Sequence, residues 1–333
     1  PVICHLTYQK NLKTMTGTDF STASEVLTSI GADVVGANCS LGPKELLKII
    51  KENRINTTFL SVQPNAGLPQ LNDNQETIFP LSATEMAAYA PQFINAGANI
   101  IGGCCGSTPQ YIKLLADTVK DLKPETKSLN STTTLTSRTN RVEIRKDGPT
   151  RIIGERINPS GRDDLSQELK AGTMDLITAE ATKQAQADAD ILDVNLGLPD
   201  IDQTKLFKKA VTAIQNTIDI PLAIDTTNIA ALETALQNIV GKPLINSVTG
   251  AEESLNQVLP LAKKYGAAIL GLTLDDEGIP TTAHKRLAIA KKIINKAESL
   301  GIQRTDILID PLVLTVGAQQ KQVLETLKAL KLI

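Results

Sequence analysis

Short apolar runs alternate with longer amphipathic stretches along most of the chain, and this pattern predicts strands separated by helices. In the first third, the apolar runs lie at 2–6, 33–37, 58–62 and 99–102. The stretches with helical spacing lie at 21–30, 43–52, 83–96 and 109–122. Because consecutive strands joined by a helix normally pair in parallel, we expect a parallel sheet in this region.

The alternation stops at a polar segment and then resumes. Residues 123–149 are rich in threonine and charge, so we expect a linker, with 142–144 able to pair as a short strand. Further strands are predicted at 152–156, 191–195, 222–225, 244–247, 267–274 and 307–310, before a helix at 320–331. The chain therefore divides into a first domain at 1–122, the linker, and a second domain at 150–333.

Composition narrows the class of protein. With 41% hydrophobic residues, 21% charged residues and a net charge of -2, the chain is typical of a packed globular protein. The absence of tryptophan, the 3% aromatic content and the lack of a basic cluster argue against nucleic-acid binding. No uncharged apolar run approaches the roughly 20 residues of a membrane span, and no signal-peptide pattern is present. We expect a cytoplasmic protein.

Three of the four cysteines follow predicted strands and are crowded by glycines, namely Cys39, Cys104 and Cys105. Three thiolates would leave the fourth position of a tetrahedral zinc open, as in catalytic zinc sites. The alternative is that these cysteines are small buried hydrophobic residues, which is our interpretation of Cys4. The glycines favour a metal site, because they let the backbone approach a ligand closely. Disulfides are not expected at this cysteine density.

Polar residues end the strands of the second domain: Asp193, Asn195, Asp225, Asn246 and Asp310. Without histidine or cysteine, this set favours hydrogen bonding to an organic ligand over a metal site. The alternative is that Asp and Asn simply terminate strands, as they often do.

Four further residues carry weaker signals. Asn65 either shapes a pocket or forms a turn. Glu155 and Arg156 point to opposite faces of a strand, so one of them faces the pocket or the two form an ion pair. His284 is expected on the surface of a helix.

The motifs resemble two known families. The runs Gly-Ala-Asn-Cys-Ser-Leu-Gly-Pro (36–43), Pro-Asn-Ala-Gly (64–67) and Gly-Gly-Cys-Cys-Gly-Ser-Thr-Pro (102–109) are similar to the zinc-dependent homocysteine S-methyltransferase barrel. The segments 154–158, 193–195, 225–228, 245–247 and 309–311 are similar to the pterin-binding methyltransferase barrel. In this order, the two resemble the front half of the cobalamin-dependent methionine synthase family.

The resemblance implies an α/β fold with two parallel (β/α)8 barrels in tandem. Each barrel needs roughly 250 residues. A chain of 333 residues is therefore expected to carry only the second half of the first barrel and the first two-thirds of the second.

The resemblance also implies a reaction, the transfer of a methyl group from 5-methyltetrahydrofolate through cobalamin to homocysteine. Cys39, Cys104 and Cys105 would hold the Zn²⁺ that activates homocysteine. Asp225, Asn246 and Asp310 would bind the pterin, with Asp193 and Asn195 lining the pocket, and Asp225 and Asn246 are counted with the cysteines as catalytic. Cobalamin would be bound by a domain elsewhere in the parent chain or by a separate protein.

Two alternatives remain open. The second barrel could serve a corrinoid protein without homocysteine activity, or belong to a relative of dihydropteroate synthase. The chain could also be a non-catalytic fragment. The cysteine motifs argue against the first alternative, because neither of its reactions needs a zinc thiolate site.

Overall fold

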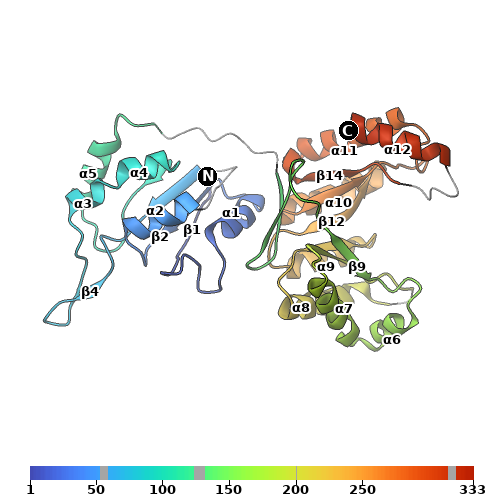
Figure 1. The fold of residues 1–333 in the computed structure, drawn as a ribbon, viewed down its shortest axis with the longest axis horizontal. Coiled ribbons are helices and arrows are strands. Elements are labelled where there is room, and N and C mark those ends of the chain that lie inside the picture. The colour runs from blue at the N-terminus through green and yellow to red at the C-terminus, as the bar shows by residue number, and fades with distance from the viewer. Residues whose placement is uncertain (53–58, 124–131, 200, 314–319) are drawn as a thin grey trace. The chain divides into compact units, whose positions relative to one another are not determined.

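The computed structural model describes residues 1–52, 59–123, 132–199, 201–313 and 320–333. The predicted start of a strand at Thr58 and the linker residues 124–131 lie outside these ranges. The chain forms two compact units, Pro1–Asn130 and Ser131–Ile333 (Figure 1). Among the described residues, none of the helices combines the length and apolarity that a membrane crossing requires.

The first unit is built on a parallel sheet with the strand order β1-β2-β3-β6. These strands are β1 (Ile3–Leu6), β2 (Val34–Asn38), β3 (Phe59–Gln63) and β6 (Ile100–Ile101). The helices are α1 (Phe20–Ser29), α2 (Pro43–Glu52), α3 (Ala83–Ala87), α4 (Ala90–Asn95) and α5 (Pro109–Val119). A small antiparallel hairpin joins β4 (Gln70–Leu71) to β5 (Thr77–Ile78).

One predicted helix is divided in two. The pattern at 83–96 predicts a single helix, whereas α3 and α4 are separated around Ala88 and Tyr89. Pro91 occupies the first turn of α4, where its missing N–H costs nothing. Proline in the interior of one long helix would instead remove a backbone hydrogen bond.

Alternation along the strands assigns the two faces of the first sheet. Cys4, Leu6, Val35 and Leu60 contribute to the helix-side core with residues such as Phe93. Cys4 is half-buried and packs against this core, which agrees with our interpretation of it as a small hydrophobic residue.

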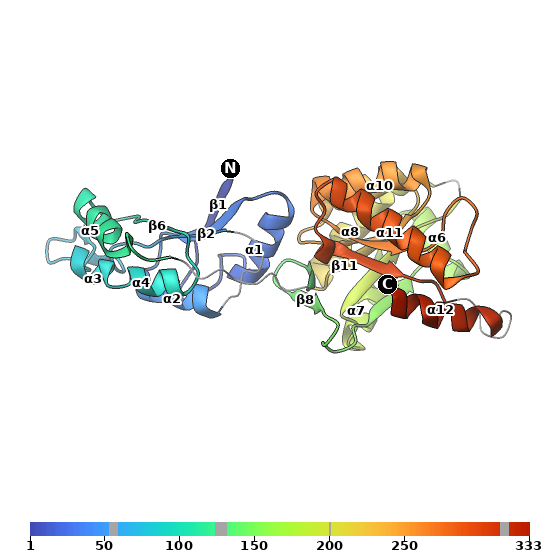
Figure 2. The same cartoon turned by 90° about the horizontal axis from the view of Figure 1, so that it is seen from above.

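The second unit is built on a parallel sheet with the order β14-β13-β12-β11-β10-β9. Its strands are β9 (Ile153–Ile157), β10 (Ile191–Asn195), β11 (Leu222–Asp225), β12 (Leu244–Thr249), β13 (Ala268–Leu272) and β14 (Ile307–Asp310). Its helices are α6 (Asp163–Ala171), α7 (Asp175–Gln186), α8 (Gln203–Thr217), α9 (Ile229–Asn238), α10 (Glu252–Tyr265), α11 (Ala283–Ser299) and α12 (Gln320–Leu332). The large core lies between helices and sheet, and Figure 2 shows α10 and α11 side by side.

An antiparallel hairpin covers the other face of this sheet near the amino ends of the strands. Within the stretch expected as a linker, β7 (Thr133–Thr136) pairs with β8 (Arg141–Ile144). Leu135 and Val142 of the hairpin pack against Ile191, Leu244 and other residues that begin the strands. The few apolar residues of this threonine-rich segment are thus enough to pack it against the sheet. The polar side chains on this face therefore lie near the carboxyl ends of the strands.

The α/β class with parallel sheets is confirmed, and the described strands form sheets of four and six strands, as the pattern predicts. That each sheet belongs to an eight-stranded barrel stays a prediction.

Candidate functional site

The three predicted cysteines converge at the carboxyl ends of β2 and β6. The Cys39 Sγ lies 3.6 Å from the Cys105 Sγ, which lies 4.0 Å from the Cys104 Sγ. All three sulfur atoms lie within 4.8 Å of one another. A tetrahedral zinc with Zn–S bonds of about 2.3 Å places its sulfur ligands about 3.8 Å apart. The donor set and its spacing therefore fit zinc.

The backbone is bent sharply to present Cys39. Cys39 and Ser40 both adopt left-handed conformations, with φ of 60° and 54°. Such conformations are uncommon outside glycine and persist where neighbouring contacts fix them. Here the Cys39 N–H donates to the Gln63 carbonyl at 3.1 Å, and the Cys104 N–H donates to the Pro64 carbonyl at 2.8 Å. Both cysteine loops are therefore tied to the end of β3.

Asn65 connects the two loops that carry the cysteines. Its side chain is buried, and its Oδ1 accepts a hydrogen bond from the Cys105 N–H at 3.1 Å. Its own N–H donates to the Leu41 carbonyl at 3.0 Å, which ties it to the loop after Cys39. Of the two readings that the sequence leaves open for Asn65, the structure favours a residue that shapes the site.

The cluster is poised to ionise at one sulfur. Burial opposes ionisation of Cys39, but hydrogen bonds involving the Ser40 backbone, Cys105, Cys104 and Asn65 outweigh it, so the pKa of Cys39 lies below its ordinary value. Donation to Cys39 is the main cause that raises the pKa of Cys105 to about 11, followed by burial. Without a cation, it is therefore unfavourable to remove a second proton from the three thiols, whereas a bound cation would stabilise all three thiolates.

In the second unit, two amide–carboxylate hydrogen bonds organise the strand ends. The Asn246 Nδ2 donates to the Asp193 Oδ1 at 2.9 Å, and the Asn195 Nδ2 donates to the Asp225 Oδ2 at 2.8 Å. Asn195, Asp225 and Asn246 also occupy one register row across β10, β11 and β12. These four side chains lie on the sheet face opposite the helices, since they alternate with core residues such as Val194 and Ile224.

Burial and neighbouring charge act strongly on Asp193. The residue is only 5% exposed. The pKa of Asp193 is raised to about 6: burial is the main cause, the hydrogen bond from Asn246 lowers the pKa, and the charges of Asp225 and Glu155 raise it. Glu155 is therefore close enough to act on the site. Within the described residues, no ion pair joins Glu155 to Arg156.

Asp310 stands apart from the other four residues. It ends β14, which is separated from β12 by β13. Its Oδ1 accepts a hydrogen bond from the Leu312 N–H at 2.7 Å. Alternation places it on the same face as Leu308, which belongs to the hairpin-side core and therefore to the face of Asp193. His284 is exposed on α11, as predicted.

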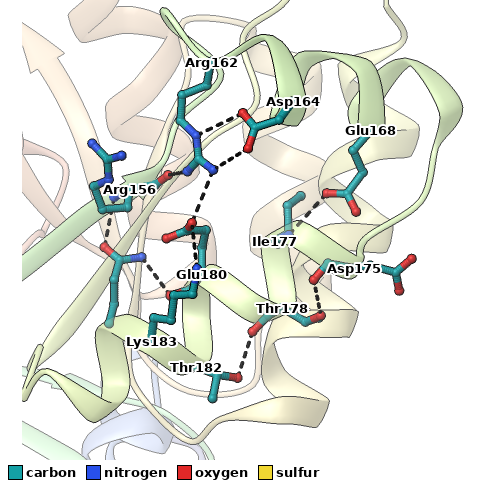
Figure 3. Close-up of polar contacts among 11 residues, drawn as sticks. Arg156, Arg162, Asp164, Glu168, Asp175, Ile177, Thr178, Glu180, Thr182 and Lys183 are labelled. Atoms are coloured by element: carbon teal, nitrogen blue, oxygen red, sulfur yellow. Dashed lines mark hydrogen bonds and ion pairs between the residues drawn. The ribbon is translucent and has the colours of Figure 1, made fainter.

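Sequence reasoning missed an arginine that braces the loop after β9. Arg162 binds both carboxylate oxygens of Asp164, at 3.4 and 2.9 Å, and contacts Glu180 at 3.3 Å (Figure 3). It also donates to the Arg156 carbonyl at 3.1 Å, at the end of β9. The close spacing of Arg162 and Asp164 was a signal, but Glu180 lies on another helix and could not be found without the fold.

Fold and site together define an α/β protein with a thiolate cluster on one sheet and a carboxylate–amide row on another. The family described as Pterin binding enzyme matches residues 154–333, more than half of the chain. The chain belongs to this family. The family described as Homocysteine S-methyltransferase matches residues 1–119, which contain all three site cysteines.

Whole-chain relatives agree with this pairing. The methionine synthase of Mycobacterium tuberculosis is 29% identical over 343 residues, covering 99% of this chain and 29% of that relative. The methionine synthase of Mycobacterium leprae is 27% identical over 348 residues, with the same coverage of 99% and 29%. The chain thus spans about 29% of the length of these relatives. The matches support the predicted class, a methyltransferase.

The dihydropteroate synthase from Vibrio fischeri is 19% identical with a TM-score of 0.41, covering 54% of this chain and 67% of that chain. The enzyme from Xanthomonas albilineans in complex with 7,8-dihydropteroate is 18% identical with a TM-score of 0.41, covering 57% and 70%.

Proposed function

We propose that this chain carries two substrate sites of a methionine-forming methyltransferase. The first unit would bind and activate homocysteine, and the second would bind 5-methyltetrahydrofolate, with cobalamin carrying the methyl group between them. The observation that carries the proposal is the convergence of Cys39, Cys104 and Cys105 in a chain that also belongs to the Pterin binding enzyme family.

The first unit would work through its three thiolates. Zinc bound there would supply a Lewis acid that keeps a substrate thiol ionised at neutral pH. Three protein sulfurs leave one tetrahedral position for that thiol. Asn65 and the Gln63 carbonyl hold the two cysteine loops in register, so the ligand geometry is set before substrate arrives.

The second unit would recognise the pterin by its hydrogen-bonding edge. A pterin offers ring N–H and amino donors next to carbonyl and ring-nitrogen acceptors, which complement carboxylates and amides respectively. Asp225 and Asn246 would face that edge, and Asp193 and Asn195 orient them through the two hydrogen bonds described above. Asp310 would complete the set from β14 by approaching the ligand from the far side of β13.

Cobalamin would be bound outside this chain's two units, on a further domain or a separate protein. The proposal therefore names three small-molecule partners: homocysteine, 5-methyltetrahydrofolate and the corrinoid. The competing function, methyl transfer from the folate to a corrinoid protein alone, leaves the spacing of the three sulfurs without a role.

Zinc content tests the proposal most directly. The purified chain, prepared under reducing conditions, should hold up to one zinc per chain, and Cys39→Ser, Cys104→Ser or Cys105→Ser should each reduce that content. Cys4→Ser is the matched control, because Cys4 packs in the helix-side core. Stoichiometric zinc that survives all three site substitutions would refute the assignment.

A further inference from the structure

An arginine occupies the buried face of α11. Arg286 is 0% exposed and lies in the same stripe as the buried residues Ala283, Ala290 and Ile293. Arginine is rarely fully buried unless its donors are satisfied. The stripe would normally pack apolar side chains against the sheet, so a guanidinium at this position points to a specific set of acceptors.

The guanidinium binds backbone carbonyls from two loops. Its Nε donates to the Pro280 carbonyl at 3.0 Å. Its Nη1 donates to the carbonyls of Pro311 and Leu312 at 2.7 and 2.9 Å. These contacts fix the segment that leaves β14, immediately after Asp310.

The same side chain also holds α12, which lies beside α11 (Figure 1). Its Nη1 contacts the Thr326 Oγ1 at 2.7 Å, and its Nη2 donates to the Gln322 Oε1 at 3.3 Å. The Thr326 Oγ1 in turn lies 3.2 Å from the Leu312 carbonyl. Leu312 is therefore held on its carbonyl side by both a guanidinium and a hydroxyl.

Leu312 connects this network to Asp310. It adopts a left-handed φ of 62°, which is uncommon for a leucine and persists only where contacts impose it. In this conformation its N–H meets the Asp310 Oδ1 at 2.7 Å. The peptide units around Leu312 thus link the Arg286 guanidinium to the orientation of the Asp310 carboxylate.

We propose that Arg286 is a positioning residue for the pterin site, which orients the Asp310 carboxylate by locking the Pro311–Leu312 turn. Arg286 itself lies under the turn and takes no part in ligand contact. This inference rests on the proposed function, since it assumes that Asp310 contacts the bound pterin.

The test is a double-mutant cycle on ligand affinity in the full chain. Calorimetric titration with 5-methyltetrahydrofolate gives Kd for the wild type, Arg286→Lys, Asp310→Ala and the double variant. Lysine keeps the positive charge but cannot reach several carbonyls at once. Arg304→Lys is the matched control, because Arg304 pairs with Glu298 on the exposed surface. Thermal melting checks that each variant is folded at the titration temperature.

If Arg286 acts through Asp310, Arg286→Lys should raise Kd about tenfold in the wild-type background and less than about twofold when Asp310 is alanine. Leu312→Gly should reduce the effect of Arg286→Lys, because glycine adopts the left-handed conformation without support. Equal effects in both Asp310 backgrounds, or no effect in the wild type, would overturn the inference while leaving the pterin site intact. An unchanged Kd for Asp310→Ala would instead remove the role of Asp310 in the proposed function, and this inference with it.

Discussion

The Asn246 side chain extends across β11 to donate a hydrogen bond to the Asp193 Oδ1 at 2.9 Å. The two residues come from strands that are not neighbours, so both side chains must lie over the sheet face rather than in the helix layer. Because Asp193 is buried, this contact also compensates part of its lost hydration. The pair therefore links the shape of the candidate pterin site to the protonation of a carboxylate.

Asp193→Asn should make the second unit more stable at neutral pH. The pKa of Asp193 is raised from 3.8 to about 6, so the folded state binds this proton more tightly than the unfolded state. The wild type therefore loses stability as pH rises from about 4 to 6, which amounts to at most about 3 kcal/mol at pH 7. Asparagine keeps an oxygen for Asn246 and has no charge to bury. Urea unfolding of both proteins across this pH range measures the difference.

The pH dependence separates this effect from general repacking. The stability difference should vanish near pH 4, where the aspartic acid is neutral in the folded protein. The exposed Asp276→Asn is the control and should show no such trend. A variant that is less stable than the wild type at every pH would contradict the interpretation.

Asn65→Ala should weaken zinc binding without removing a cysteine. The Asn65 Oδ1 accepts the Cys105 N–H at 3.1 Å, and its loss leaves that N–H without this acceptor beside the cluster. Removing a group that supports a metal ligand typically reduces metal affinity by about 10- to 100-fold. Competition with a chromophoric chelator measures the change. Asn72→Ala, which alters only the β4–β5 turn, should bind zinc like the wild type, and equal affinities of all three proteins would argue against a supporting role for Asn65.

The candidate site residues could be predicted from the sequence, but the residues that hold them in position could not. Cys39, Cys104 and Cys105 could be brought together in advance because each follows a strand, and parallel strands end at one edge of a sheet. Asp193, Asn195, Asp225 and Asn246 obey the same rule. Asp310 follows it too, yet its register partner on β13 is Leu272, whereas the partner of Asn246 on β13 is Leu270, so Asp310 does not share the register row of Asn246, which strand counting does not reveal.

The supporting residues depend on contacts between distant segments. The docking of the β7–β8 hairpin relies on a few residues such as Leu135, which give no clear period in a threonine-rich segment. The only sequence signal for Arg286 is that a charged residue stands among the apolar residues on one face of a helix. Two of its acceptors, the carbonyls of Pro311 and Leu312, lie 25 and 26 residues along the chain, in a turn whose conformation no local pattern predicts.

Lys242→Met should strongly destabilise the second unit. The Lys242 Nζ lies 2.6 Å from the Asp306 Oδ1, and the two residues are 2% and 9% exposed. Removing one partner of a buried ion pair typically costs about 3–5 kcal/mol, because the other charge stays in an apolar environment. The double variant with Asp306→Asn should be less destabilised than Lys242→Met alone. Lys264→Met breaks the exposed pair with Glu233 and should be far less destabilising in the same denaturation experiment, because solvent screens that pair.

Gly36→Ala should destabilise the first unit through a clash within the sheet. A Cβ at this position would overlap the His5 ring and the Ser61 carbonyl oxygen. Overpacking of this kind costs about 1–3 kcal/mol. Adding His5→Ala should restore only part of the stability, because the backbone oxygen cannot move away. Gly102→Ala is the control, since its Cβ would meet only the flexible Gln63 side chain at 3.3 Å, and a similar loss in both variants would show that the His5 and Ser61 contacts are not the cause.

Asp225→Ala should weaken 5-methyltetrahydrofolate binding by about 1–3 kcal/mol, the range for leaving a buried polar partner unpaired. Asp225 ends β11 half-buried, and the Asn195 amide at 2.8 Å fixes one carboxylate oxygen. The other oxygen can therefore be presented to a ligand N–H without a loss of side-chain freedom on binding. Asp225→Asn should give a smaller loss, because one oxygen acceptor remains.

Titration calorimetry suits this measurement, because the chain has no tryptophan to report binding. Asp219→Asn is the matched control: Asp219 precedes the same strand, at the opposite end of the sheet, where it binds Thr139 of the hairpin. If Asp225→Ala and Asp219→Asn bound the folate equally well, the carboxyl-end row could not be the pterin site. Suppose instead that only Asp225→Ala lost affinity and that both variants melted as cooperatively as the wild type. The loss would then belong to the ligand contact. Both substitutions remove a carboxylate from β11 or from the residues just before it, but only Asp225 lies on the proposed pterin edge.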